Sequence, residues 1–130
     1  MVEQIFEQIL KNRGISKENR EAFLSPNYDN QHDPFLLPDM EKAVERLLVA
    51  HKKQEKITVY GDYDVDGVSA STVILTAFEK FGFKNVDYFL PDRFKDGYGM
   101  NERGVKILAE RGTNLILTVD CGSLNHVEID

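Results

Sequence analysis

The chain has 130 residues, of which 42% are hydrophobic, and a formal net charge of −6 at pH 7. No apolar run reaches the roughly 18 residues of a membrane span, and the first residues lack a basic and then apolar leader, so we expect a soluble cytoplasmic protein of one domain or part of one. The acidic charge argues against a broad basic surface for nucleic acid, although bound metal ions can invert the charge of an acidic site.

The chain opens with two predicted helices. Apolar residues recur at helical spacing from Ile5 to Leu10, and the pattern stops at Gly14. Ser16 is a candidate N-cap for a second, short helix that reaches Leu24.

An irregular connection and a longer helix follow. Residues 25–38 are rich in Pro, Asn and Asp, which are typical of loops. Asp39 is expected to cap the next helix, whose apolar stripe runs from Met40 to His51. We expect His51 to lie at the boundary of the core and not to act as a ligand. Residues 1–55 are therefore predicted to form a helical lead-in.

From residue 56 the pattern changes to strands that alternate with helices. Strands are predicted at 57–60, 86–90 and 115–119, with helices at 70–81 and 101–112 between them. Asn101 is a candidate cap for the second of these helices. The order βαβαβ predicts an α/β fold with a parallel sheet and right-handed crossovers.

The third strand, 115–119, has few polar residues, as expected for a strand covered on both faces. After Gly122 only residues 123–130 remain, which cannot complete a helix and add another strand. A three-stranded sheet with a strand at its open end would expose an unpaired edge and an uncovered face. We therefore expect this chain to be the N-terminal piece of a larger protein.

Four aspartates are predicted to lie at one rim of this sheet. Asp62, Asp64 and Asp66 stand at alternate positions after the first strand, and Asp120 directly follows the third. The carboxyl ends of parallel strands share an edge, where open α/β sheets bind their ligands. Two carboxylates about 5 Å apart repel by roughly 3 kcal/mol at an effective dielectric constant of about 20. Such a cluster favours hard divalent cations, and two of them would cancel the four charges.

Three other interpretations of the aspartate string compete with the metal site. An EF-hand loop begins similarly, but its twelfth position, counted from Asp62, is Val73 and not the required glutamate. Residues 64–68 resemble the first motif of the haloacid-dehalogenase phosphatases, which normally follows its strand without the intervening residues found here. A turn rich in Asp and Gly also occurs without any ligand. The strand before the string and the fourth aspartate favour the metal site.

The lone cysteine, Cys121, follows the fourth aspartate. A single cysteine excludes an internal disulfide and the usual cysteine-rich zinc sites. We expect Cys121 to be a small buried residue and not a nucleophile.

Four segments in chain order resemble one family, the DHH phosphoesterases. Residues 59–67 resemble its first motif and residues 117–122 its second. Residues 32–40 and 91–101 resemble segments of one branch, the RecJ single-strand-specific exonucleases. The resemblance covers nearly the whole chain.

This resemblance implies an incomplete DHH domain at residues 56–130. It implies a phosphodiesterase that uses Mn²⁺ or Mg²⁺, with two ions in the complete enzyme, and that removes nucleotides from the 5′ end of single-stranded DNA in repair and recombination. Asp64, Asp66 and Asp120 would be catalytic metal ligands, and Asp62 would belong to the same site. The Asp-His-His motif that names the family is absent, so we expect the isolated chain to be inactive.

Two alternatives to this function stay open at the level of sequence. One is a DHH phosphodiesterase for oligoribonucleotides or cyclic dinucleotides. The other is a non-catalytic domain that kept the fold as a metal-binding remnant.

The segment between the two family motifs holds two candidate substrate contacts. Arg93 has the chemistry to clamp a phosphate, and Tyr98 has the flat ring on which a base can stack. Alternatively, Gly97 and Gly99 only shape a turn and Tyr98 packs in the interior. The two interpretations are balanced.

Overall fold

The computed structural model describes residues 2–25 and 27–129. The chain divides into two compact units, and the boundary falls between Glu41 and Lys42. Across the described ranges, no helix combines the length and the apolar composition needed to cross a membrane.

The first unit contains two short helices and two single-turn 3₁₀ helices. Its elements are α1 (Val2–Asn12), α2 (Arg20–Leu24), η1 (Tyr28–Asn30) and η2 (Pro34–Leu36). The predicted pair of helices is confirmed, but α2 begins at Arg20 and not directly after Ser16. The Ser16 hydroxyl accepts a hydrogen bond from the backbone N–H of Asn19 at 3.3 Å, so it caps the turn that precedes α2.

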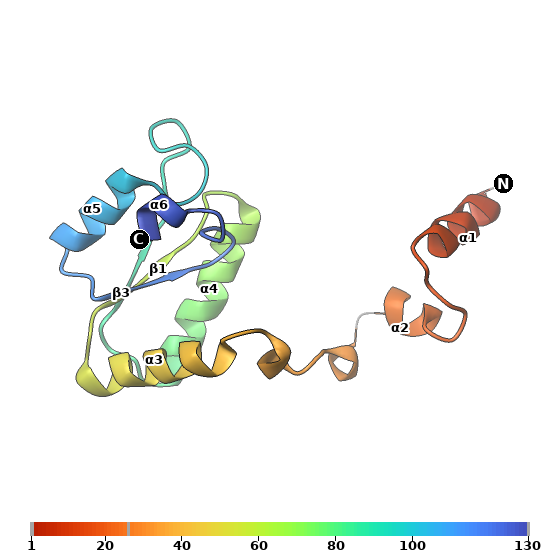
Figure 1. Ribbon diagram of the computed structural model, residues 1–130, viewed down its shortest axis with the longest axis horizontal. Coiled ribbons are helices and arrows are strands. Elements are labelled where there is room, and N and C mark those ends of the chain that lie inside the picture. The colour runs from red at the N-terminus through yellow and green to blue at the C-terminus, as the bar shows by residue number, and fades with distance from the viewer. Residues whose placement is uncertain (1, 26, 130) are drawn as a thin grey trace. The chain divides into compact units, whose positions relative to one another are not determined.

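The parallel sheet predicted from the sequence is confirmed in the second unit. The unit boundary falls in the first turn of α3 (Met40–Lys53). The elements that follow are β1 (Ile57–Tyr60), α4 (Val65–Lys80), β2 (Val86–Phe89), α5 (Glu102–Glu110), β3 (Leu115–Thr118) and α6 (His126–Ile129). The strand order is β2-β1-β3, and both strand pairs are parallel. The central strand is therefore β1, and Figure 1 shows α4 and α5 on opposite sides of it.

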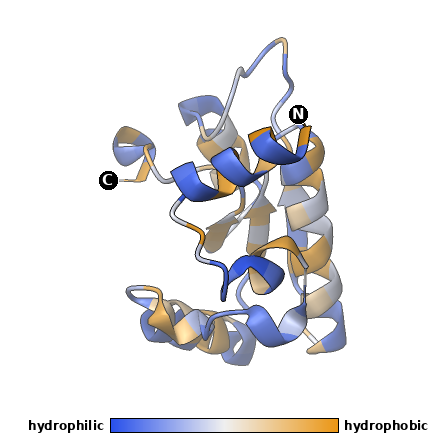
Figure 2. Cartoon of the chain, turned by 90° about the vertical axis from the view of Figure 1, so that its right-hand side faces the viewer, coloured by the Kyte–Doolittle hydropathy of each residue, from blue (hydrophilic) through white to orange (hydrophobic). Residues whose placement is uncertain are grey.

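Alternate residues of β1 enter two hydrophobic clusters. Ile57 and Val59 pack with Ala50 of α3 and Phe78 of α4. Tyr60 packs on the other face with a second set of buried residues, Phe89, Met100 and Leu108. All four residues of β1 are buried, and Figure 2 shows orange, hydrophobic parts of the sheet in the interior behind the helices. Because hydrophobic clusters cover both faces of β1, most of its residues are apolar.

The edge strand β3 differs from the sequence expectation. Its four residues, Leu115–Thr118, are only half-buried, because β3 pairs with β1 alone among the described strands. His51 lies where expected, at the boundary of the core, with its ring centre 4.3 Å from that of Phe83.

Leu108 provides a test of the cluster under α5. Its side chain is 0% exposed, so Leu108→Ala should lower the free energy of unfolding by about 2 to 5 kcal/mol through lost burial and a residual cavity. Urea unfolding of the chain measures the change. Leu48→Ala is the matched control, because Leu48 of α3 is 57% exposed and its truncation should change stability by less than about 0.5 kcal/mol. Equal losses in both variants would contradict the described core.

Candidate metal centre

The loop that joins β1 to α4 is packed tightly against the first turns of the helix. A Cβ atom on Gly67 would lie 2.3 Å from the backbone oxygen of Asp62, and one on Gly61 would lie 2.2 Å from the hydroxyl oxygen of Ser71. Real side chains do not tolerate such distances, so only glycine allows this approach. The sequence pattern did not single out either glycine for this role. Their effect is to press the backbone of Asp62 onto α4.

Asp62 is the most unusual side chain of the site. It is 0% exposed, and neither carboxylate oxygen has a hydrogen-bond partner within residues 2–25 and 27–129. Buried polar groups are nearly always paired, and an unpaired buried charge is costly. A cation bound to these oxygens would remove the cost. The burial of Asp62 is therefore the strongest single indication of a metal site.

Asp64 has a second role that the sequence pattern did not reveal. It is the N-cap of α4, and its Oδ1 atom accepts hydrogen bonds from the backbone N–H groups of Asp66 and Gly67, both at 3.1 Å. These bonds and the positive end of the helix dipole stabilise its negative charge. They also fix the orientation of the carboxylate.

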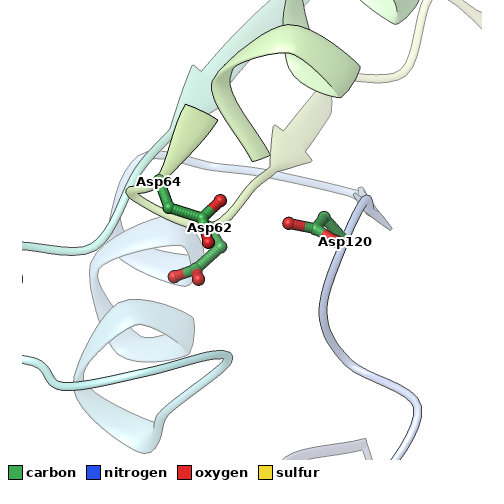
Figure 3. Close-up of side chains that lie close together, drawn as sticks. All are labelled: Asp62, Asp64 and Asp120. Atoms are coloured by element: carbon green, nitrogen blue, oxygen red, sulfur yellow. The ribbon is translucent and has the colours of Figure 1, made fainter. Parts of the chain in front are cut away.

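Asp120 approaches the first two aspartates from the end of β3. Its backbone is left-handed, with φ of 59°, which aspartate tolerates better than most residues. Oxygen atoms of Asp62, Asp64 and Asp120 all lie within 4.8 Å of one another. Figure 3 shows the Asp120 carboxylate directed toward the other two. The convergence expected from the strand ends is thus present for these three residues.

Asp66, the fourth predicted ligand, is placed differently. It lies exposed in the first turn of α4 and is not one of the three residues whose oxygens converge. Its charge still acts on the cluster. Loss of hydration raises the pKa of Asp120, and the negative charges of Asp64, Asp66 and Asp62 raise it further.

The sequence predicted that Cys121 is buried, but in the structure it is only half-buried. Its thiol donates a hydrogen bond to the backbone oxygen of Tyr60 at 3.6 Å. Burial, and then the charges of Asp62 and Asp120, raise the pKa of the thiol to about 11. A thiol with this pKa is almost entirely protonated at neutral pH, so it is not an activated nucleophile.

The two predicted substrate contacts, Arg93 and Tyr98, lie in the loop between β2 and α5. The guanidinium carbon of Arg93 is 5.4 Å from the centre of the ring of Tyr63, which stands between Asp62 and Asp64 in the chain. Tyr98 is 71% exposed, so it does not pack in the interior. Loss of hydration raises the pKa of Tyr98, and the nearby charges of Asp62 and Asp120 raise it further.

A hollow opens next to the carboxylates. Its volume is about 530 Å³, and it is lined by Tyr98, Thr118 and residues 120–125. The hollow thus brings the carboxylate of Asp120 and the exposed ring of Tyr98 to one surface, where a metal ion and a planar group could be held near each other.

The chemistry of the three converging side chains fits a hard divalent cation. All three offer carboxylate oxygens, one of them buried without another partner among the described residues. Mg²⁺ and Mn²⁺ favour such oxygen ligands, whereas softer metals favour sulfur and nitrogen. The residues present therefore suit Mg²⁺ or Mn²⁺.

Comparisons with known proteins identify a family and several similar proteins. Residues 56–130 match the family described as "DHH family, N-terminal domain". The chain is 43% identical over 115 residues to the single-stranded-DNA-specific exonuclease RecJ of Bacillus subtilis (strain 168), a match that covers 88% of this chain and 14% of that relative. It is 39% identical over 94 residues to the protein of the same name from Escherichia coli (strain K12), covering 72% of this chain and 16% of the relative.

A solved structure is similar over most of the chain. It is the crystal structure of RecJ in complex with Mn²⁺ from Thermus thermophilus, with a TM-score of 0.63 and 26% sequence identity. The similarity covers 92% of this chain and 16% of that chain. The chain thus spans only about a sixth or less of the length of these relatives.

Replacing Asp62 tests whether its buried charge is held for a metal. Asp62→Asn should make the metal-free chain more stable by about 1 kcal/mol or more, because the uncompensated charge is removed. The rise in melting temperature that Mn²⁺ produces in the parent chain should disappear. Thermal unfolding with and without Mn²⁺ measures both effects.

Asp87→Asn is the matched control for this substitution. Asp87 lies in β2, where its carboxylate is 3.7 Å from the ammonium group of Lys56 and partly exposed. The Mn²⁺ effect should persist in this variant. A full Mn²⁺ effect in Asp62→Asn would show that Asp62 is not a ligand.

Proposed function

The chain belongs to the DHH family, and on this premise we propose that it is part of a metal-dependent phosphodiesterase, a single-stranded-DNA-specific 5′ to 3′ exonuclease. The proposal is carried by one observation, the buried and unpaired carboxylate of Asp62 that faces Asp64 and Asp120 within the described part of the chain. The names of the similar proteins support the substrate class. We place the activity in DNA repair and recombination, in the cytoplasm.

The aspartates would hold the metal. Asp62, Asp64 and Asp120 supply the oxygens that already converge, and Asp66 would join them from the first turn of α4. We propose Asp64, Asp66 and Asp120 as the catalytic residues, with Mn²⁺ or Mg²⁺ as the cofactor and two ions in the complete enzyme. Divalent ions in such sites activate water and neutralise the charge that develops on the attacking and leaving oxygens.

The protein side chains have defined tasks in this proposal. The N-cap bonds of Asp64 keep its carboxylate oriented before substrate arrives. Arg93 would hold a phosphate of the strand beside the carboxylates, and Tyr98 would stack on a base across the hollow. Stacking requires an unpaired base, which agrees with a preference for single strands.

The family match over residues 56–130 supports a domain assignment. We propose residues 56–130 as the N-terminal part of the DHH domain and residues 1–55 as a helical lead-in. Three converging carboxylates do not fill the coordination sphere of two ions. Further ligands from other parts of the complete protein would be needed, and we expect the isolated chain to be inactive.

Asp120 provides the test of this function. In the complete protein, Asp120→Asn should lower turnover of single-stranded DNA by about a thousandfold, because a ligand that stabilises transition-state charge is lost. Release of nucleotides from 5′-labelled strands at saturating Mn²⁺ measures the change. Asp87→Asn, in β2 away from the carboxylate cluster, should keep full activity. An active Asp120→Asn variant would contradict the assignment, and a parent that cleaves only dinucleotides would favour the small-substrate alternative.

A further inference from the structure

Asp96 is a buried charge in a surface loop. It lies between β2 and α5, and its side chain is only 2% exposed, whereas Arg93 and Tyr98 in the same loop are exposed. A carboxylate is rarely buried unless it is paired. The burial of the Asp96 carboxylate therefore implies that other groups compensate its charge.

Asp96 closes the start of the loop into a ring. Its Oδ2 atom accepts a hydrogen bond from the backbone N–H of Asp92 at 2.8 Å, and its own N–H donates to the backbone oxygen of Asp92 at 2.8 Å. Its Oδ1 atom forms an ion pair with the guanidinium of Arg103 in α5. The Asp92 amide and Arg103 lower the pKa of Asp96, so it is charged at neutral pH.

The end of the same loop is tied to the strand that leads into the metal centre. Tyr60, the last residue of β1, is 0% exposed, and its hydroxyl donates to the backbone oxygen of Gly99 at 3.2 Å. The side chain of Asn101 caps α5 through the N–H of Gly104 at 2.8 Å and donates to the Tyr60 hydroxyl at 3.4 Å. The loop is thus fixed at both ends.

Arg93 and Tyr98 lie between these fixed points. Arg93 stands inside the ring closed by Asp96, and Tyr98 stands between Asp96 and Gly99. Arg93 lies over the ring of Tyr63, which stands between Asp62 and Asp64 in the chain, and Tyr98 lines the same hollow as Asp120. Arg103 is 57% exposed, so its ion pair with Asp96 adds little stability, and the contacts of Asp96 act mainly on the conformation of the loop.

We propose that Asp96 is a positioning residue. Through Asp92 and Arg103 it holds the loop in the conformation that places Arg93 and Tyr98 beside the carboxylate cluster. It thereby sets the affinity for the nucleic-acid strand and takes no part in the hydrolysis itself. This inference rests on the proposed function.

Steady-state kinetics of the complete protein test this role. With Mn²⁺ and 5′-phosphorylated single-stranded oligonucleotides, Asp96→Ala should raise KM by about tenfold or more and leave kcat unchanged, because misplaced contacts weaken binding and not chemistry. The Mn²⁺ concentration that gives half-maximal activity should also stay unchanged. Arg103→Ala, which leaves Asp96 in place, should raise KM in the same direction by a smaller factor.

A double-mutant comparison separates positioning from general loss of structure. In a background that carries both Arg93→Ala and Tyr98→Ala, Asp96→Ala should have no further effect on KM, because the groups that it positions are gone. Asp87→Ala, which removes another ion-paired aspartate, should leave KM unchanged in either background.

The outcomes distinguish the two levels of the proposal. A parent protein without nuclease activity would overturn the proposed function and this inference with it. An active parent whose KM is unaffected by Asp96→Ala, or whose kcat falls while KM stays constant, would overturn the inference alone. If Asp96→Ala does not fold, Arg103→Ala decides, and an unchanged KM in that variant would overturn the positioning role.

Discussion

The close packing of the Asp62 backbone against α4 is the constraint on which the site depends. Gly61 and Gly67 permit this approach, because a Cβ atom at either position would collide with Ser71 or with Asp62 itself. The consequence is a carboxylate held at 0% exposure without a hydrogen-bond partner among the described residues. The fold therefore accepts a local loss of stability at the point where the proposed function needs a cation ligand.

The rest of the rim is arranged around this buried charge. Asp64 is oriented by the helix that it caps, and Asp120 follows β3, which pairs with β1 in the same sheet. Loss of hydration, and then repulsion by the neighbouring carboxylates, raise the pKa of Asp120. A bound divalent cation would relieve this repulsion. The loop that carries Arg93 and Tyr98 is anchored to the end of β1, so one strand positions both the proposed metal ligands and the proposed substrate contacts.

Local patterns and strand topology were enough to predict much of this arrangement. The meeting of Asp62 with Asp120 followed from the shared edge of parallel strands, and Asn101 is confirmed as the cap of α5. The half-burial of β3 was not predicted, because it depends on which strand takes the centre of the sheet. The buried state of Asp96 was missed as well, since its partner Arg103 lies in the next helix. Contacts of this kind leave no periodic signal in a sequence.

The central claim is that Asp62, Asp64 and Asp120 bind one divalent ion together. Anomalous X-ray scattering from crystals of the complete protein grown with Mn²⁺ tests it most directly. We expect a manganese peak in direct contact with carboxylate oxygens of all three residues, at the rim shown in Figure 3. A fully occupied peak elsewhere, with the Asp62 carboxylate still buried and bound to no metal, would contradict the account.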